Sequence, residues 1–210
     1  MSKLHSVIAV AVCLLTPTVV LPLVLGPGPA LAEGTPVRVR GTVVSLDGST
    51  LVVHTKDGKD VTVSLKDKCA ALAVVKSSMD EIKAGTFIGT ATEPQPDGSL
   101  RAVEVVVFPE TLRGFAEGHY PWDLGPKSMM TNATIAQKVQ KVDGETVDVT
   151  YKGGEKKITI PSNIPIVGLV PSEHSDIEPG AHVFVPTEKQ ADGTLLAGAV
   201  LFGKGVVPPM

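Results

Sequence analysis

Cysteine is scarce in this chain of 210 residues, which contains only two. Cys13 lies in an apolar N-terminal segment, so Cys69 is alone in the remainder. A single cysteine cannot form an intramolecular disulfide, and burial and hydrogen bonds must therefore hold the fold. We expect Cys69 to pack as a small buried hydrophobic group, the alternative being a free or intermolecular thiol.

Aromatic residues and net positive charge are also lacking. Phe, Trp and Tyr make up 4% of the chain, and the formal net charge is -3. Nucleic-acid binding needs a basic surface for the phosphates, and single strands also need aromatic platforms for the bases. The composition therefore predicts no nucleic-acid partner.

Long apolar runs are absent after Ala32 but present before it. Lys3 precedes an uncharged, mostly apolar stretch over residues 4–25, and the sequence Ala-Leu-Ala ends at Ala32. This order is typical of a secretory signal peptide, residues 1–32, cleaved after Ala32. The alternative is a retained anchor, since the run is long enough to span a bilayer if straight, although two prolines interrupt it. We expect a periplasmic or secreted protein with no integral membrane domain beyond this segment.

The remainder of the chain is an internal duplication. Residues 80–102 return as residues 175–197, with Asp-Ile, Gly, Glu, Gln, Asp-Gly, Leu and Ala in the same order, at a spacing of about 95 residues. Apolar and polar residues alternate over residues 37–43 and 61–65, which is the period of half-buried strands. Asp47-Gly48 and Asp57-Gly58 predict tight turns between strands, whereas a calcium loop would need more oxygen ligands at closer spacing.

The predicted order in each repeat is three strands, a short helix and two strands. In the first repeat, residues 66–84 lose the strand period, residues 77–83 suggest a helical turn, and strands follow at 86–92 and 100–108. This is the order of a five-stranded OB-type barrel. We therefore predict an all-β protein of two tandem OB-like barrels, over residues 36–109 and 132–203, with a disordered tail over residues 204–210.

The segment between the repeats, residues 110–131, has no counterpart and contains the only tryptophan. Flexible linkers are rich in Gly and Ser and poor in aromatics, so we expect this linker to be ordered. In one interpretation its large side chains wedge between the barrels and fix their angle. These side chains are Phe115, Tyr120, Trp122 and Met129.

Two other interpretations of the linker give it a binding function. A ligand or partner groove would have Trp122 as its anchor, with Arg113, His119 and Asp123 around it. A metal site would use Glu117, His119 and Asp123, although Pro121 opposes a helix that would place the last two on one face.

Motifs of catalysis are missing from the sequence. It has no G-x-S-x-G elbow, no H-E-x-x-H, no P-loop and no Cys-His signature. We therefore expect a non-enzymatic binding or interaction module without a cofactor, which binds an envelope protein or a small ligand. The alternatives are a periplasmic metal-binding or metal-delivery protein that uses the linker, and a hydrolase whose site is not visible in the sequence.

The duplicated Glu/Asp-Ile-x-x-Gly and Asp-Gly-Ser/Thr-Leu segments, and the run from Gly118 to Asp123 that leads to residues 130–134, resemble a known family. It consists of uncharacterised secreted bacterial proteins with tandem β-barrel domains of unknown function. Some similar sequences carry the label of metal ABC transporter permease. A permease needs several spanning helices, and the sequence after Ala32 has no run long enough for one.

Overall fold

The computed structural model describes residues 34–141, 144–203 and 206–208, and the predicted signal peptide lies outside them. The described chain is all-β, as predicted, with short 3-10 helices and no α-helix among these residues. No helix in the described part has the length and apolar character needed to cross a membrane.

The strands follow the duplication. The first repeat contains β1 (Thr35–Asp47), β2 (Thr50–Thr55), β3 (Asp60–Lys76), η1 (Met79–Glu81), β4 (Phe87–Pro94) and β5 (Leu100–Val107). The segment between the repeats contains η2 (Glu110–Leu112) and β6 (Gly118–Pro121). The second repeat contains β7 (Met129–Lys141), β8 (Gly144–Tyr151), β9 (Gly154–Ile160), β10 (Ile166–Ser172), η3 (His174–Asp176), β11 (His182–Lys189) and β12 (Leu195–Gly203).

The Asp-Gly pairs form turns, as predicted. Gly48 and Gly58 have φ angles of 54° and 78°, a left-handed conformation that glycine adopts without steric cost. In the β4–β5 turn, Asp97 Oδ1 accepts a hydrogen bond from the backbone N–H of Ser99 at 2.9 Å. The local chemistry of these residues therefore sets the ends of the strands.

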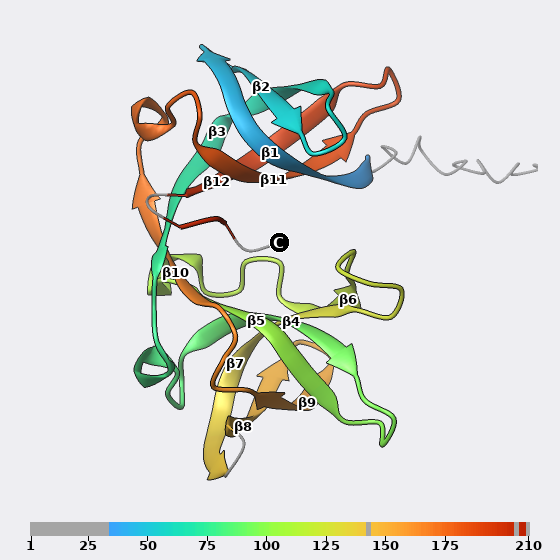
Figure 1. Cartoon of the computed structure of the whole chain (residues 1–210), viewed down its shortest axis with the longest axis vertical. Helices are drawn as coiled ribbons and strands as arrows, with labels where there is room; N and C mark the ends of the chain where they lie inside the picture. The colour runs from blue at the N-terminus through green and yellow to red at the C-terminus, as the bar shows by residue number, and fades with distance from the viewer. Residues whose placement is uncertain (1–33, 142–143, 204–205, 209–210) are drawn as a thin grey trace, which may run out of the picture. The chain divides into compact units, whose positions relative to one another are not determined.

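Five strands close into a first ring of pairings, in the order β1-β2-β3-β12-β11 and back to β1 (Figure 1). All contacts in it are antiparallel except the one between β3 and β12, which is parallel. The side chains inside this ring form one apolar cluster, which includes Val39, Leu51, Val63, Val185 and Phe202. Cys69 belongs to this cluster with 8% of its surface exposed, as expected for a buried thiol.

The remaining long strands form a second ring, β7-β8-β9-β5-β4 and back to β7. Here the parallel contact lies between β9 and β5. Its interior is a separate apolar cluster with Ile88, Val105, Ile135, Val149 and Ile158. Alternation of apolar residues at 147, 149 and 151, and at 158 and 160, predicts strands in the second repeat, and β8 and β9 confirm them.

Each ring combines strands from both repeats, which corrects the predicted domain organisation. Residues 36–109 and 132–203 do not each close on themselves, because β1 and β3 pair with β11 and β12, whereas β4 and β5 pair with β7 and β9. The hairpin β4–β5 of the first repeat and the hairpin β11–β12 of the second have exchanged places between the duplicated halves. Exchange of equivalent elements preserves the contacts of a closed ring, so it costs little.

The reason for the exchange lies in β3. The strand period is lost in the sequence over residues 66–84, but β3 continues to Lys76 and pairs antiparallel with β10. Residues 71–74 of this extension are buried on both faces, since Ala71 and Ala73 face the first ring while Leu72 and Val74 join a third cluster. A strand buried on both faces shows no alternation of apolar and polar residues, so the strand period is absent there. The exposed residues 66–68 precede it, at a register shift in the pairing with β12.

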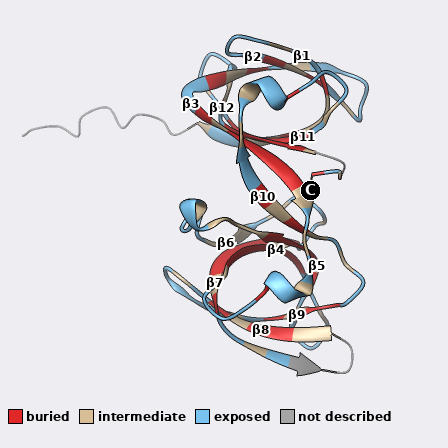
Figure 2. Ribbon diagram, turned by 90° about the vertical axis from the view of Figure 1, so that its left-hand side faces the viewer, coloured by how far each residue is buried: buried red, intermediate tan, exposed pale blue. Residues whose placement is uncertain are grey.

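The third cluster lies where the rings meet. It contains Leu72, Val74, Val106, Val167, Leu169, Phe184, Ala199 and Leu201, with Phe108 and Trp122 packed against it. Figure 2 shows buried residues along the strands of both rings and along β3, which passes from one ring toward the other.

Three smaller predictions need correction. Strand alternation from Ile135 predicts that Val139 faces inward, but 48% of Val139 is exposed because a bulge between Ile135 and Gln137 reverses the facing of later residues. The predicted linker ends early, since β7 begins at Met129. In the tail expected to be disordered, Val206 packs against the third cluster and Pro208 is buried.

Candidate functional site

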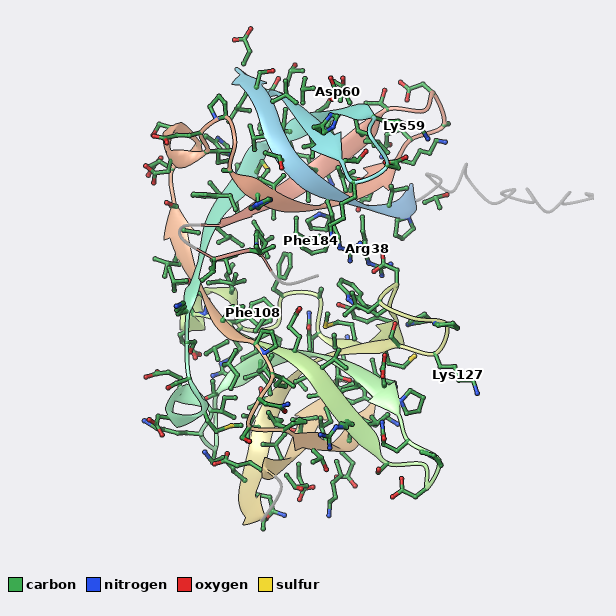
Figure 3. The ribbon with its side chains drawn as sticks, in the orientation of Figure 1. Arg38, Lys59, Asp60, Phe108, Lys127 and Phe184 are labelled. Atoms are coloured by element: carbon green, nitrogen blue, oxygen red, sulfur yellow. The ribbon has the colours of Figure 1, made fainter. Side chains whose placement is uncertain are left out.

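A cavity of about 510 Å³ lies between the two rings. One wall comes from β1, β3, β11 and β12, with Val37, Arg38, Leu72, Phe184, Pro186 and Leu201. The opposite wall comes from β4, β5 with its following residue, and β7, with Gly89, Glu104, Val106, Phe108, Met130 and Asn132. Figure 3 shows Arg38 and Phe184 on one side and Phe108 on the other, facing the space between the rings.

The segment between the repeats supplies the third side of the cavity, with Phe115, Ala116, Tyr120, Pro121 and Trp122. Strand β6 holds this segment in place by pairing with the start of β7. Ser128 Oγ donates to the carbonyls of Trp122 and Gly125, at 2.9 Å each, and thereby closes the loop between these strands. The linker is therefore ordered at the place where the sequence suggested it.

Trp122 spans the gap between the rings. Its ring meets Phe184 of β11 edge-on, at 5.9 Å between centroids and 71° between planes, and Tyr120 at 6.2 Å and 62°. The guanidinium carbon of Arg38 lies 4.0 Å from the centre of the Trp122 ring, a cation–π geometry. Trp122 thus packs between the rings, as the interpretation of the linker as a wedge requires. It also lines the cavity, as the interpretation of the linker as part of a ligand groove requires.

Asp123 anchors the loop after β6 to the first ring. Its carboxylate accepts two hydrogen bonds from Arg40, at 2.7 and 2.8 Å, and lies 4.0 Å from Nε of Arg38. Burial raises the pKa of Asp123, but the hydrogen bonds and charge of Arg40, together with Arg38, outweigh it and hold the pKa below its usual range. Asp123 is therefore a charged partner of two arginines.

Asn132 is the polar group deepest in the second ring's wall, with 5% of its surface exposed. Its side-chain nitrogen donates to the Phe115 carbonyl and to the Tyr120 hydroxyl, both at 3.2 Å. Its Oδ1 is buried and has no hydrogen-bond partner in the described structure. Such an uncompensated acceptor is rare in a folded protein and needs a physical explanation.

Gly89 lies beside Asn132 in the sheet, and its lack of a side chain leaves room for the buried Oδ1 atom. A Cβ at this position would stand 2.7 Å from Asn132 Oδ1 and 3.0 Å from the ring of Phe108. Any side chain here would therefore displace one of these neighbours. By the repeat spacing Gly89 corresponds to Phe184, and Glu104 of the same wall corresponds to Ala199. The two copies thus differ at positions that shape the cavity.

The other linker residues singled out in the sequence lie elsewhere. Arg113 donates to Glu110, to the Gly85 carbonyl and to Thr134. Glu117 accepts a hydrogen bond from the backbone N–H of Lys152 at 3.1 Å. Neither side chain lines the cavity.

His119 faces a different, polar depression on the second ring. Its Nδ1 lies 2.8 Å from the hydroxyl of Thr131, and its ring stacks on Tyr151 at 6.2 Å. Burial, with a smaller contribution from the charge of Lys156, lowers the pKa of His119 below its usual value. A half-buried neutral histidine with a hydroxyl partner fits a structural position.

The structure does not bring the three candidate metal ligands together. Glu117 contacts Lys152, His119 contacts Thr131, and Asp123 binds Arg40. Within the part of the chain that the structure describes, no three His, Cys, Asp or Glu side chains gather into a group that could hold a metal ion.

Sequence reasoning found Trp122 but missed Gly89, Glu104 and Asn132. These three stand on different strands that only the register of the second ring brings to one wall, since Gly89 pairs with Asn132 and Val106. The available signal was the divergence between the repeats, where Gly replaces Phe and Glu replaces Ala. Comparisons with protein-family models, curated proteins and solved structures found no match to this chain.

Proposed function

We propose that this protein is a non-enzymatic binding protein that holds a small apolar molecule in the cavity between its rings. The observation that carries the proposal is the cavity itself, about 510 Å³ in volume and walled by aromatic and aliphatic side chains. Ligand sites in proteins have volumes of about 300–1,000 Å³, and a few polar groups in an apolar lining orient the ligand.

The fold supports this function. We infer that each ring is an OB-like barrel, because its order of strands and its single parallel contact match a meander closed by a hairpin. Exchange of the hairpins links the two barrels through β3 and β10, so the walls of the cavity are fixed by continuous strands. A preformed cavity of this kind binds ligand with little loss of conformational entropy.

We also propose that the protein acts outside the cytoplasm after removal of residues 1–32. The support is the basic, apolar and Ala-Leu-Ala pattern of that segment. N-terminal sequencing of protein isolated from the envelope fraction tests this, and we expect the first residue to be Glu33. A first residue of Met1 or Ser2 would contradict it.

Titration with the neutral fluorophore N-phenyl-1-naphthylamine tests the binding function. Its emission rises when it leaves water for an apolar site, so we expect a saturable increase with one site per chain. Trp122 is the only tryptophan of the chain and lines the cavity. Its own emission should therefore change over the same concentration range and report the place of binding.

Two glycine substitutions provide the matched pair. Gly89→Leu places a side chain against Asn132 and Phe108 inside the cavity and should abolish the titration. Gly198→Leu is at an exposed position of β12, where the nearest atom to an added Cβ is a lysine carbon at 3.9 Å, and should bind like the parent. Equal binding by both variants, with both folded by circular dichroism, would place the probe elsewhere and refute the proposal.

A further inference from the structure

We propose that the ligand of this cavity is a neutral apolar alcohol, whose hydroxyl donates a hydrogen bond to Oδ1 of Asn132. This inference rests on the proposed binding function and deepens it by naming the polar group that the site recognises. Asn132 is 95% buried, lines the cavity and carries an acceptor without a partner. A buried acceptor left unpaired costs free energy, which a bound donor recovers.

The orientation of the Asn132 amide follows from its neighbours. The main-chain carbonyl of Phe115 can only accept a hydrogen bond, and it lies 3.2 Å from the amide nitrogen. The nitrogen must therefore face Phe115, and Oδ1 must point the opposite way, toward Gly89. Since Gly89 has no side chain, nothing from this position covers Oδ1.

Tyr120 complements the acceptor. Its hydroxyl accepts a hydrogen bond from the amide nitrogen of Asn132 at 3.2 Å, which leaves its own proton to donate. Burial raises the pKa of Tyr120, with Arg38 acting in the opposite direction, so the hydroxyl keeps this proton at neutral pH. The wall thus offers an acceptor and a donor, the pair that an alcohol needs.

The burial of this wall disfavours an anionic ligand. Glu104 lines the same wall and is 7% exposed, so a ligand carboxylate placed beside it would lose its hydration in an apolar setting, which costs free energy. Arg38, the cation of the opposite wall, already donates to the Pro121 carbonyl at 3.2 Å and covers the Trp122 ring. These contacts hold its guanidinium against the segment between the repeats.

Competition against bound N-phenyl-1-naphthylamine tests the proposal with ligands of equal length. We expect 1-decanol to displace the probe at a concentration about tenfold lower than decyl methyl ether does, the value of one net hydrogen bond. The ether matches the alcohol in apolar character but has no donor. Sodium decanoate should compete more weakly than the alcohol.

Two variants of Asn132 connect the preference to this residue. Asn132→Leu removes the acceptor and should bring the alcohol and the ether to equal affinity. Asn132→Asp, titrated at a pH low enough to protonate this carboxyl group, keeps a donor toward the Phe115 carbonyl and an acceptor toward Gly89, and should keep the preference for the alcohol. If Asn132→Leu keeps the preference for the alcohol and Asn132→Asp loses it, Oδ1 is not the atom that binds the hydroxyl.

The outcomes separate this inference from the proposed function. If alcohol and ether compete equally well in the parent protein, the hydroxyl proposal fails while the cavity still binds. If decanoate competes best, Arg38 rather than Asn132 recognises the ligand, and the inference is likewise overturned. If probe binding itself is absent, the proposed function fails first.

Discussion

The exchange of hairpins predicts a disulfide between the two repeats. Thr42 of β1 lies opposite His182 of β11, and neither side chain is buried. Cysteines at both positions, in a Cys69→Ala background, should therefore oxidise to an intramolecular disulfide. If each repeat closed on itself, these positions would lie in different rings and no such bond would form.

The expected stabilisation follows from the length of the loop that the disulfide closes. Residues 42 to 182 form a loop of about 140 residues, for which the chain-entropy model gives about 5 kcal/mol. Engineered disulfides commonly yield less because they strain the native geometry, so we expect about 2–4 kcal/mol between the reduced and oxidised forms. Urea denaturation followed by circular dichroism measures this difference.

A protease site inserted in the exposed loop at residues 114–117 allows the disulfide between positions 42 and 182 to be detected on a gel. After oxidation at low protein concentration and cleavage, the two fragments should stay joined on a denaturing gel without reductant and separate with it. The variants with a single cysteine are the controls and should separate in both conditions. Failure of the double variant to crosslink as a monomer would refute the exchanged arrangement.

Further predictions concern single residues. Trp122→Ala should lower the free energy of unfolding by about 2 kcal/mol, because it removes the edge contact to Phe184 (about 0.5–1.5 kcal/mol) and the cation–π contact to Arg38 (about 0.5–1 kcal/mol). Leu124→Ala in the same loop should cost under about 0.5 kcal/mol, and equal losses in urea titrations would argue against the wedge. Because the pKa of His119 is lowered by burial, the folded state binds its proton less tightly than the unfolded state. The stability contributed by neutral His119 is thus complete above pH about 6.5 and declines as the pH falls below that value. The difference between the parent and His119→Gln should therefore shrink between pH 7.5 and pH 5.5, and a constant difference would contradict this.

Much of the secondary structure could be predicted because local chemistry specifies it. Alternation over residues 37–43 and the Asp-Gly pairs place strands and turns wherever one face of a strand is buried. Alternation gave no strand over residues 66–76, because residues 71–74 of β3 are buried on both faces and residues 66–68 lie at a register shift. Alternation also misleads at Val139, where a bulge that no residue type indicates reverses the facing of the strand.

The residues of the candidate site could likewise be predicted only in part. Trp122 could be expected there because it lies in the one segment without a copy, and large aromatic side chains bury much apolar surface. Arg113 and Glu117, chosen from the same segment, instead hold neighbouring backbone groups. Their roles depend on which atoms come within hydrogen-bonding distance, which sequence proximity does not give.

The amino-acid sequence by itself determined an all-β chain with two equivalent sets of strands. It did not determine which hairpin closes which ring, because the duplicated hairpins present similar apolar faces, as Ile88 and Val183 show in their separate cores. Tertiary structure decided this through the straight course of β3 beside β10. The same pairing brought Gly89 and Asn132 together, because cross-strand register, unlike local propensity, acts between residues far apart in the chain.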